Sequence, residues 1–121
     1  MQNRHIMVIE DDAATLSFVV DFLEMNDYEV LPWPTASQAI EQATQYQPDL
    51  VLLDHRLDLA LSGWDILLTL CHQPATAHIP VILYSAESGF IHSVRDEVRS
   101  MHCDVLDKPF EPEILLAKLK P

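Results

Sequence analysis

The sequence predicts an α/β fold in which helices cover both faces of a doubly wound parallel sheet. Five strand patterns alternate with five helical patterns along the chain, in the order βαβαβαβαβα. Three of the strand patterns, IMVI, LVLL and VILY, are continuously apolar, as expected for strands buried on both faces of a parallel sheet. Right-handed crossovers and short loops favour the doubly wound arrangement. The 121 residues fit one domain, 1–121.

The expected strands are His5–Ile9, Tyr28–Leu31, Asp49–Leu53, Val81–Tyr84 and Asp104–Leu106. The second is more polar than the others, which suits the edge of a sheet. Between the strands, apolar residues recur at the spacing of one buried helical face. These groups are Leu16, Val19, Val20 and Leu23; Ala39, Ile40 and Ala43; the stretch from Trp64 to Cys71; Ile91, Val94, Val98 and Met101; and Leu115, Leu116 and Leu119.

Several residues predict where helices begin and end. Asp12 is expected to cap the first helix, and Asn26-Asp27 to end it. Thr35-Ala36-Ser37-Gln38 has the pattern of a capping box at the start of the second helix. Pro112 suits the first turn of the last helix, where its missing N–H costs nothing.

Composition narrows the class of protein. Hydrophobic residues make up 49% and charged residues 21%, which is ordinary for a globular domain. The net charge of −12 argues against a nucleic-acid partner, which would require clustered Lys and Arg. No apolar run reaches the ~18 residues of a membrane span, and none is long enough for a signal peptide, so we expect a cytoplasmic protein. Cys71 and Cys103 fall in apolar stretches and are expected to be small buried thiols rather than a disulfide or a redox pair.

The ends of the strand patterns carry the polar residues that indicate function. Acids follow the first run at Glu10, Asp11 and Asp12, and Asp54 closes the third run. In doubly wound sheets the ligand site lies at the carboxyl ends of the strands, where these acids would meet. Carboxylate oxygens are ligands that Mg²⁺ prefers. Each acid alone has a simpler explanation, because Asp12 and Asp54 are also residue types that cap helices.

Two further side chains reach the same predicted edge. Lys108 follows the fifth strand pattern, and an ammonium there would neutralise clustered carboxylates and could hold a phosphoryl oxygen. Ser85 ends the fourth, where a helix cap or a satisfied loop hydroxyl is an equal alternative. Together with the acids, they predict a site for a divalent cation and a phosphoryl group.

The chain resembles the response-regulator receiver domain of two-component signalling over essentially its whole length. Four motifs carry the resemblance: VIEDD at the first strand, PDLVLLD at the third, IPVILYSA at the fourth and LDKPFEPEIL at the end. All four in this order, at family-like separations, are highly specific. The resemblance implies a flavodoxin-like (βα)5 fold, a five-stranded parallel sheet in the order 2-1-3-4-5.

The resemblance also implies a function. Asp54 would accept a phosphoryl group from a histidine kinase or phosphotransfer protein, so the chain would catalyse only its own phosphorylation and dephosphorylation. Lys108 would bind the phosphoryl group, Ser85 would move to hydrogen-bond it, and the Lys108–Pro109 bond would be cis. The expected Mg²⁺ ligands are Asp11, Asp54, Glu10 through water, and the backbone carbonyl of Arg56.

A downstream protein partner would bind the face of the fourth helix, fifth strand and fifth helix. Residues expected on that face are Arg95, Arg99, Met101 and Leu116.

The chain departs from the family pattern in the loop after Asp54. Gly63 stands one residue farther from Asp54 than the usual glycine, and Leu57-Asp58 replaces Met-Pro, which indicates a one-residue insertion. As one of only two glycines, Gly63 is expected in a left-handed conformation. A second departure is Val105, which occupies the position of the usual switch aromatic. A signal would then travel by another route, such as the loop 86–90 and the fourth helix.

Arg56 and Glu87 stand two residues beyond the expected acceptor and the expected switch hydroxyl, respectively. We hypothesise that they pair over Asp54, restrict water and prolong the life of the phosphoryl form, with Asp12 in a secondary electrostatic role. The alternative is two independent solvated side chains, since exposed ion pairs contribute only ~0–1 kcal/mol.

The leading prediction is therefore a phosphorylation-controlled switch. The alternative is an atypical receiver that serves as a phosphorylation-independent docking module, which Val105 and the altered loop favour. A third possibility is a metal-dependent phosphatase with an aspartyl nucleophile. Such an enzyme would need a second acid two residues after Asp54, and Arg56 at that position argues against it.

Overall fold

The structure, a computed structural model, describes residues 4–56, 62–108 and 111–119. Its five strands form one parallel sheet in the order β2-β1-β3-β4-β5, which confirms the predicted fold and the edge position of the second strand. The strands lie within one or two residues of their predicted ends: β1 (His5–Ile9), β2 (Glu29–Trp33), β3 (Leu50–Asp54), β4 (Val81–Ser85) and β5 (Asp104–Asp107).

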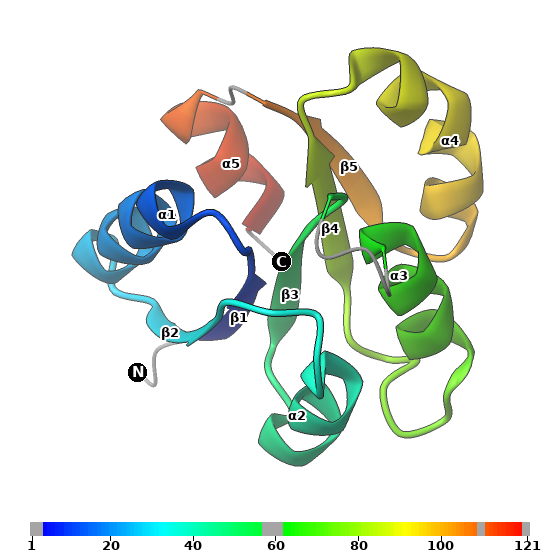
Figure 1. Ribbon diagram of the computed structural model, residues 1–121, viewed down its shortest axis with the longest axis horizontal. Helices are drawn as coiled ribbons and strands as arrows, with labels where there is room; N and C mark the ends of the chain where they lie inside the picture. Colours follow the sequence, from blue (N-terminus) through cyan, green and yellow to red (C-terminus); the bar gives the residue numbers. More distant parts are fainter. Residues whose placement is uncertain (1–3, 57–61, 109–110, 120–121) are drawn as a thin grey trace.

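The helices divide between the two faces of the sheet. They are α1 (Ala13–Met25), α2 (Ala39–Tyr46), α3 (Gly63–His72), α4 (Ser88–Ser100) and α5 (Pro112–Leu119). Figure 1 shows α1 and α5 on one face and α2, α3 and α4 on the other. Because side chains alternate along a strand, Ile6 and Val8 pack under α1 and α5, whereas Met7 and Ile9 join the larger cluster on the opposite face. Both faces are thus covered, which is why the run IMVI is apolar throughout.

Three of the predicted helix ends are confirmed and one is wrong. Pro112 is the first residue of α5. Asp12 caps α1 by accepting a hydrogen bond from the Thr15 N–H at 2.9 Å, and Asn26 is the C-cap. The capping box predicted from Thr35 to Gln38 does not form. Gln38 adopts a left-handed backbone (φ 60°) immediately before α2, so it cannot stand inside the first turn as a capping box requires.

The prediction of a left-handed backbone at Gly63 is also wrong. Gly63 has no positive φ, and it is the first residue of α3 rather than a left-handed loop position. Its N–H donates to the His55 carbonyl at 2.9 Å, which holds the start of α3 against the end of β3. A β-carbon at this position would overlap the carbonyl oxygen of Asp54. Close approach of two backbone segments, and not backbone conformation, therefore requires glycine here.

The two cysteines lie side by side, although 32 positions separate them in the sequence. The Sγ atoms of Cys71, in the last turn of α3, and Cys103, just before β5, are 3.6 Å apart. Both are free thiols, and Cys103 is buried as predicted, whereas Cys71 is only partly buried. A hydrogen bond from Cys71 lowers the pKa of Cys103 to about 7, even though burial acts in the opposite direction. Within the described ranges, no helix is both long and apolar enough to cross a membrane.

Candidate functional site

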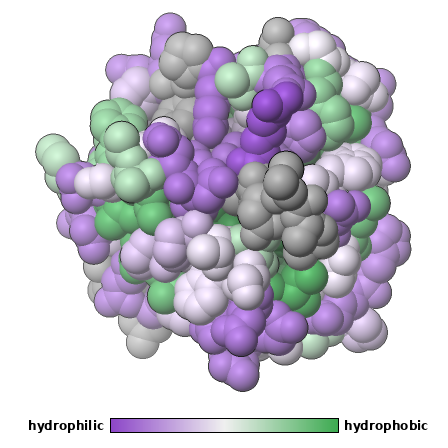
Figure 2. Space-filling view, in the orientation of Figure 1, coloured by the Kyte–Doolittle hydropathy of each residue, from purple (hydrophilic) through white to green (hydrophobic). Residues whose placement is uncertain are grey.

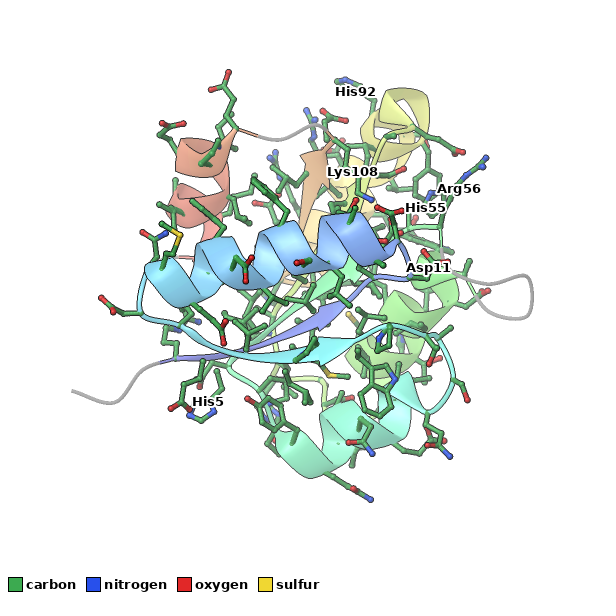
Figure 3. The ribbon with its side chains drawn as sticks, turned by 60° about the vertical axis from the view of Figure 1, so that its left-hand side comes forward. His5, Asp11, His55, Arg56, His92 and Lys108 are labelled. Atoms are coloured by element: carbon green, nitrogen blue, oxygen red, sulfur yellow. The ribbon has the colours of Figure 1, made fainter. Side chains whose placement is uncertain are left out.

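The predicted polar residues meet at the carboxyl edge of the sheet, where its strand order reverses. From β1 the chain continues to β2 on one side, while β3 pairs with β1 on the other. A crevice opens beyond the ends of β1 and β3 at such a switch point. Figure 3 shows one end of the sheet carrying Asp11, His55, Arg56 and Lys108, with His5 at the opposite end. The geometric prediction from the strand ends is therefore correct.

Three acids lie together in this crevice. Carboxylate oxygens of Glu10, Asp11 and Asp54 all lie within 4.8 Å of one another. Glu10 is fully buried and Asp54 is 4% exposed, whereas Asp11 faces solvent. Two buried carboxylates and one exposed carboxylate form an oxygen-rich group that is open to solvent on one side. Such a donor set suits a hard divalent cation that retains water ligands.

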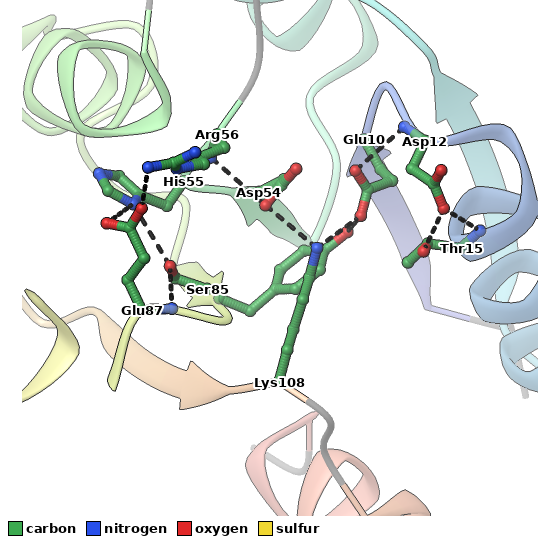
Figure 4. Close-up of polar contacts among 10 residues, drawn as sticks. Glu10, Asp12, Thr15, Asp54, His55, Arg56, Ser85, Glu87 and Lys108 are labelled. Carbon is green, nitrogen blue, oxygen red and sulfur yellow. Dashed lines mark hydrogen bonds and ion pairs between the residues drawn. The ribbon is translucent and has the colours of Figure 1, made fainter. Parts of the chain in front are cut away.

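Lys108 bridges the two buried acids. Its Nζ lies 2.9 Å from Glu10 Oε1 and 3.2 Å from Asp54 Oδ1 (Figure 4). The ammonium also lies 4.4 Å from the ring centroid of Tyr84, and the Tyr84 hydroxyl donates to Glu10 Oε1 at 2.8 Å. Sequence reasoning missed Tyr84. A tyrosine in a continuously apolar strand was the available signal, because a buried hydroxyl usually finds a partner.

The acids differ in their electrostatics. Burial, together with the neighbouring Glu10, raises the pKa of Asp54 to about 7, against the attraction of Lys108. Burial also acts to raise the pKa of Glu10, but hydrogen bonds from Asp54, Lys108 and Tyr84 outweigh it and lower that pKa. Glu10 is therefore the ionised partner of Lys108, while Asp54 is poised to change charge near neutral pH. A bound divalent cation would favour ionised Asp54.

Ser85 is buried at the end of β4 and already hydrogen-bonded. Its Oγ accepts from the Glu87 N–H at 2.9 Å and lies 3.3 Å from His55 Nδ1. The loop that follows β4 is thus tied to the serine. A cavity of about 260 Å³ opens beside it, lined by Asp54, Arg56, Ser85, Ala86, Glu87 and Lys108. At roughly 30 Å³ for each water molecule in the liquid, this cavity has room for a phosphoryl group beside Asp54.

Arg56 and Glu87, which both line this cavity, form the ion pair that the sequence predicted. Their side chains are 78% and 40% exposed, so solvent screens the attraction between them. The Arg56 N–H also approaches Asp54 Oδ1 at 3.4 Å. In the space-filling view of Figure 2, a band of hydrophilic atoms crosses the upper middle of this face, to the right of the hydrophobic atoms over α1.

His55 was not predicted as a site residue. Its ring stacks on Phe90 of α4, with centroids 3.8 Å apart and planes at 7°. Burial lowers the pKa of His55, against the attraction of Glu87. Its position directly after Asp54 was a signal in the sequence, but the partner ring comes from a distant segment.

The remaining predictions concern Asp12, residues outside the described ranges, and the partner face. Asp12 has its carboxylate engaged by Thr15 as the cap of α1, which leaves any electrostatic role a prediction. Predictions on Leu57-Asp58 and on the Lys108–Pro109 bond lie outside the described residues.

The expected partner face contains a groove of about 280 Å³, lined by Arg95, Arg99, Val105, Leu106, Asp107, Glu111, Ile114 and Lys118. The other two residues expected on this face, Met101 and Leu116, instead pack partly buried against the two cores.

This fold, with its acids and lysine at the switch point, defines the class of receiver domains, which are signalling switches rather than conventional enzymes. The family model of the response regulator receiver domain matches residues 6–120, and the chain belongs to that family.

Among its relatives, the phosphate regulon transcriptional regulatory protein PhoB of Klebsiella pneumoniae is 32% identical over 120 residues. That match covers 97% of this chain and 50% of PhoB, so the chain spans about half the length of such curated relatives.

Two solved structures are similar over nearly their whole length. The BeF3-activated N-terminal receiver domain of RstA from Klebsiella pneumoniae is 26% identical with a TM-score of 0.78, covering 95% of this chain and 94% of that one. The receiver domain of the sensor histidine kinase PA1611 from Pseudomonas aeruginosa PAO1 was solved with a magnesium ion in its active-site cleft. It is 23% identical with a TM-score of 0.80, covering 95% and 93% of the two chains.

Proposed function

We propose that Asp54 accepts a phosphoryl group from a histidine kinase or phosphotransfer protein, in a Mg²⁺-dependent reaction that changes binding to a protein partner. The observation that carries this proposal is the convergence of three acids and one ammonium. Lys108 Nζ lies 3.2 Å from Asp54, and the carboxylate oxygens of Glu10, Asp11 and Asp54 lie within 4.8 Å of one another. The 121 residues would act as a single receiver domain.

The acid group suits a magnesium ion, and the similar receiver domain of PA1611 was solved with a magnesium ion in its active-site cleft. Asp11 and Asp54 would be direct ligands together with the Arg56 carbonyl, and Glu10 would act through water. Bound there, the ion would offset the negative charge that builds up between carboxylates and phosphoryl oxygens. Because Asp11 is exposed, a bound ion could keep water ligands and exchange with solvent.

The transfer needs little covalent chemistry from the protein. An oxygen of ionised Asp54 attacks the phosphorus of a phosphohistidine, the N–P bond breaks, and a mixed acyl phosphate forms on Asp54. Lys108 then exchanges part of its contact with Asp54 for a phosphoryl oxygen, and Ser85 donates its hydroxyl to another. Positioning and charge neutralisation account for most catalysis of phosphoryl transfer. Arg56 and Glu87 restrict the access of water to the cavity and so prolong the lifetime of the acyl phosphate.

The groove between α4, β5 and α5 is the proposed partner surface. Arg95 Nε and Asp107 Oδ1 are buried there without a hydrogen-bond partner among the described residues. Ile114 lies between the charged residues of the groove and is 45% exposed. Unpaired groups of both signs beside an exposed apolar side chain suit a protein partner that supplies the missing hydrogen bonds.

The alternative is a docking module that never takes up phosphate. The buried aliphatic Val105 favours it, because no aromatic ring on β5 can respond to the site. The two functions differ in what they predict for Asp54. A phosphoacceptor must become phosphorylated there, whereas a docking module must not.

The deciding experiment is incubation with a small acyl phosphate and Mg²⁺, followed by intact-mass analysis. The parent should gain the mass of one phosphoryl group, and Asp54→Ala should gain nothing. Asp21→Ala removes an exposed acid on α1 and is the matched control, which should behave like the parent. Chelation of Mg²⁺ should abolish the reaction. A parent that stays unmodified and does not bind beryllofluoride with Mg²⁺ would exclude the phosphoacceptor function and leave the docking alternative.

A further inference from the structure

The position of Val105 raises the question of how the state of Asp54 reaches α4. Val105 is 3% exposed and packs in the core with only aliphatic atoms to offer. It therefore has no ring that could follow a movement of Ser85. The His55 side chain contacts Ser85 and also packs against α4.

His55 lies between the site and two helices. On one side its Nδ1 is 3.3 Å from Ser85 Oγ (Figure 4). On the other side its ring lies flat on Phe90 in the first turn of α4, with centroids 3.8 Å apart. Phe90 in turn meets Trp64 of α3 edge-on, at 6.0 Å and 89°. A continuous set of contacts thus runs from the serine hydroxyl to the starts of α3 and α4.

The backbone of His55 is fixed at both ends. Its N–H donates to the Tyr84 carbonyl and its carbonyl accepts from the Gly63 N–H, each at 2.9 Å. A change at His55 must therefore occur in its ring rather than in its backbone. A ring in flat contact with Phe90 cannot turn without displacing Phe90, because packed side chains leave little free space.

We propose, resting on the proposed function, that His55 is a positioning residue that couples the phosphoryl state of Asp54 to α4 through Ser85 and Phe90. The Ser85 hydroxyl carries one proton, and in the proposed resting form it donates that proton to an unprotonated His55 Nδ1, 3.3 Å away. A phosphoryl group on Asp54 brings strong acceptor oxygens into the cavity that Ser85 lines. Ser85 then donates to the phosphoryl group. His55 Nδ1 loses Ser85 and is left facing Glu87 Oε2, which lies 3.9 Å away at rest, and the ring shifts against Phe90.

The test measures site occupancy and helix response separately. Trp33→Phe leaves Trp64 as the single tryptophan, because the chain has only two. Beryllofluoride with Mg²⁺ serves as the probe, with fluorine NMR reporting its binding and Trp64 emission reporting movement at Phe90. In this background His55→Phe keeps a flat ring but loses the nitrogen that meets Ser85, and His55→Ala loses both. His92→Ala, an exposed histidine of α4, is the control.

We expect all three variants to bind beryllofluoride within about threefold of the parent affinity, since the described contacts of the His55 side chain are with Ser85, Glu87 and Phe90 rather than with the three clustered acids. The change in Trp64 emission should be lost in His55→Ala and His55→Phe and retained in His92→Ala. An unchanged emission response in either His55 variant would overturn the coupling, because a residue that only packs would alter stability and not the response. A parent with no bound-fluoride signal would instead refute the proposed function itself.

Discussion

Replacement of Gly63 by alanine should destabilise the fold and disturb the candidate site together. A β-carbon at Gly63 would overlap the Asp54 carbonyl oxygen and lie 2.8 Å from both the Asp54 carbonyl carbon and the His55 Cα. Ordinary contacts between carbon atoms lie at about 3.5–4.0 Å, and all three obstacles are backbone atoms, which no rotamer change can remove. The start of α3 or the end of β3 must therefore move.

Overpacking of a tight site costs typically about 1–3 kcal/mol, and strain in two hydrogen-bonded backbone segments places Gly63→Ala at the upper end, at about 3 kcal/mol. The matched control is Gly89→Ala in α4, where an added β-carbon meets no atom within 4 Å. This control should be neutral or gain up to about 1 kcal/mol from the lower conformational freedom of alanine in the unfolded chain. Urea unfolding followed by circular dichroism measures both. A Gly63→Ala protein as stable as Gly89→Ala would refute the close-approach explanation.

Three further predictions concern charge, lifetime and thiols. Because the pKa of Asp54 is raised to about 7 from 3.8, the folded state holds this proton more tightly than the unfolded chain. In metal-free buffer the free energy of unfolding should thus fall as the pH rises between these values, and Asp54→Asn should remove that fall in urea titrations. Arg56→Ala should shorten the half-life of the phosphoryl form, measured by radiolabel decay, and an equal or longer half-life would end the proposed role of the pair. Oxidised glutathione should join Cys71 to Cys103 by thiol–disulfide exchange, because their sulfurs lie 3.6 Å apart. Thiol labelling should then count two free thiols before oxidation and none after it, whereas a persistent count of two would exclude the bond.

The strands and their polar ends could be predicted because burial on both faces leaves a plain pattern. In Leu50–Asp54 every residue is buried, so the apolar run and the acid that closes it mark the strand and its carboxyl end directly. The parallel order then brings such ends to one edge. Lys108 could be assigned to the site for the same reason, since it follows the end of β5.

Other parts of the site depend on distances that a linear pattern does not contain. The rings of His55 and Phe90 come from different segments of the chain. Only the packing of α4 decides which aromatic ring stacks on His55. Gly63 was explained wrongly because glycine has two uses, positive φ and close approach, and the sequence does not distinguish them. The capping box at Thr35 failed because Gln38 takes a left-handed turn just before α2 begins.

The outer strand β2 carries a consequence for self-association. The Glu29 N–H points toward β1, since it donates to the Arg4 carbonyl at 2.9 Å. Because N–H directions alternate along a strand, the N–H groups at positions 30 and 32 would point away from the sheet. Position 32 is one of these, and Pro32 has no N–H to offer. If a strand of a second copy paired with this edge, the ladder of backbone hydrogen bonds would be interrupted at Pro32. Proline on an edge strand is a known protection against edge-to-edge aggregation. Copies of this chain should therefore not associate by extending the sheet at β2.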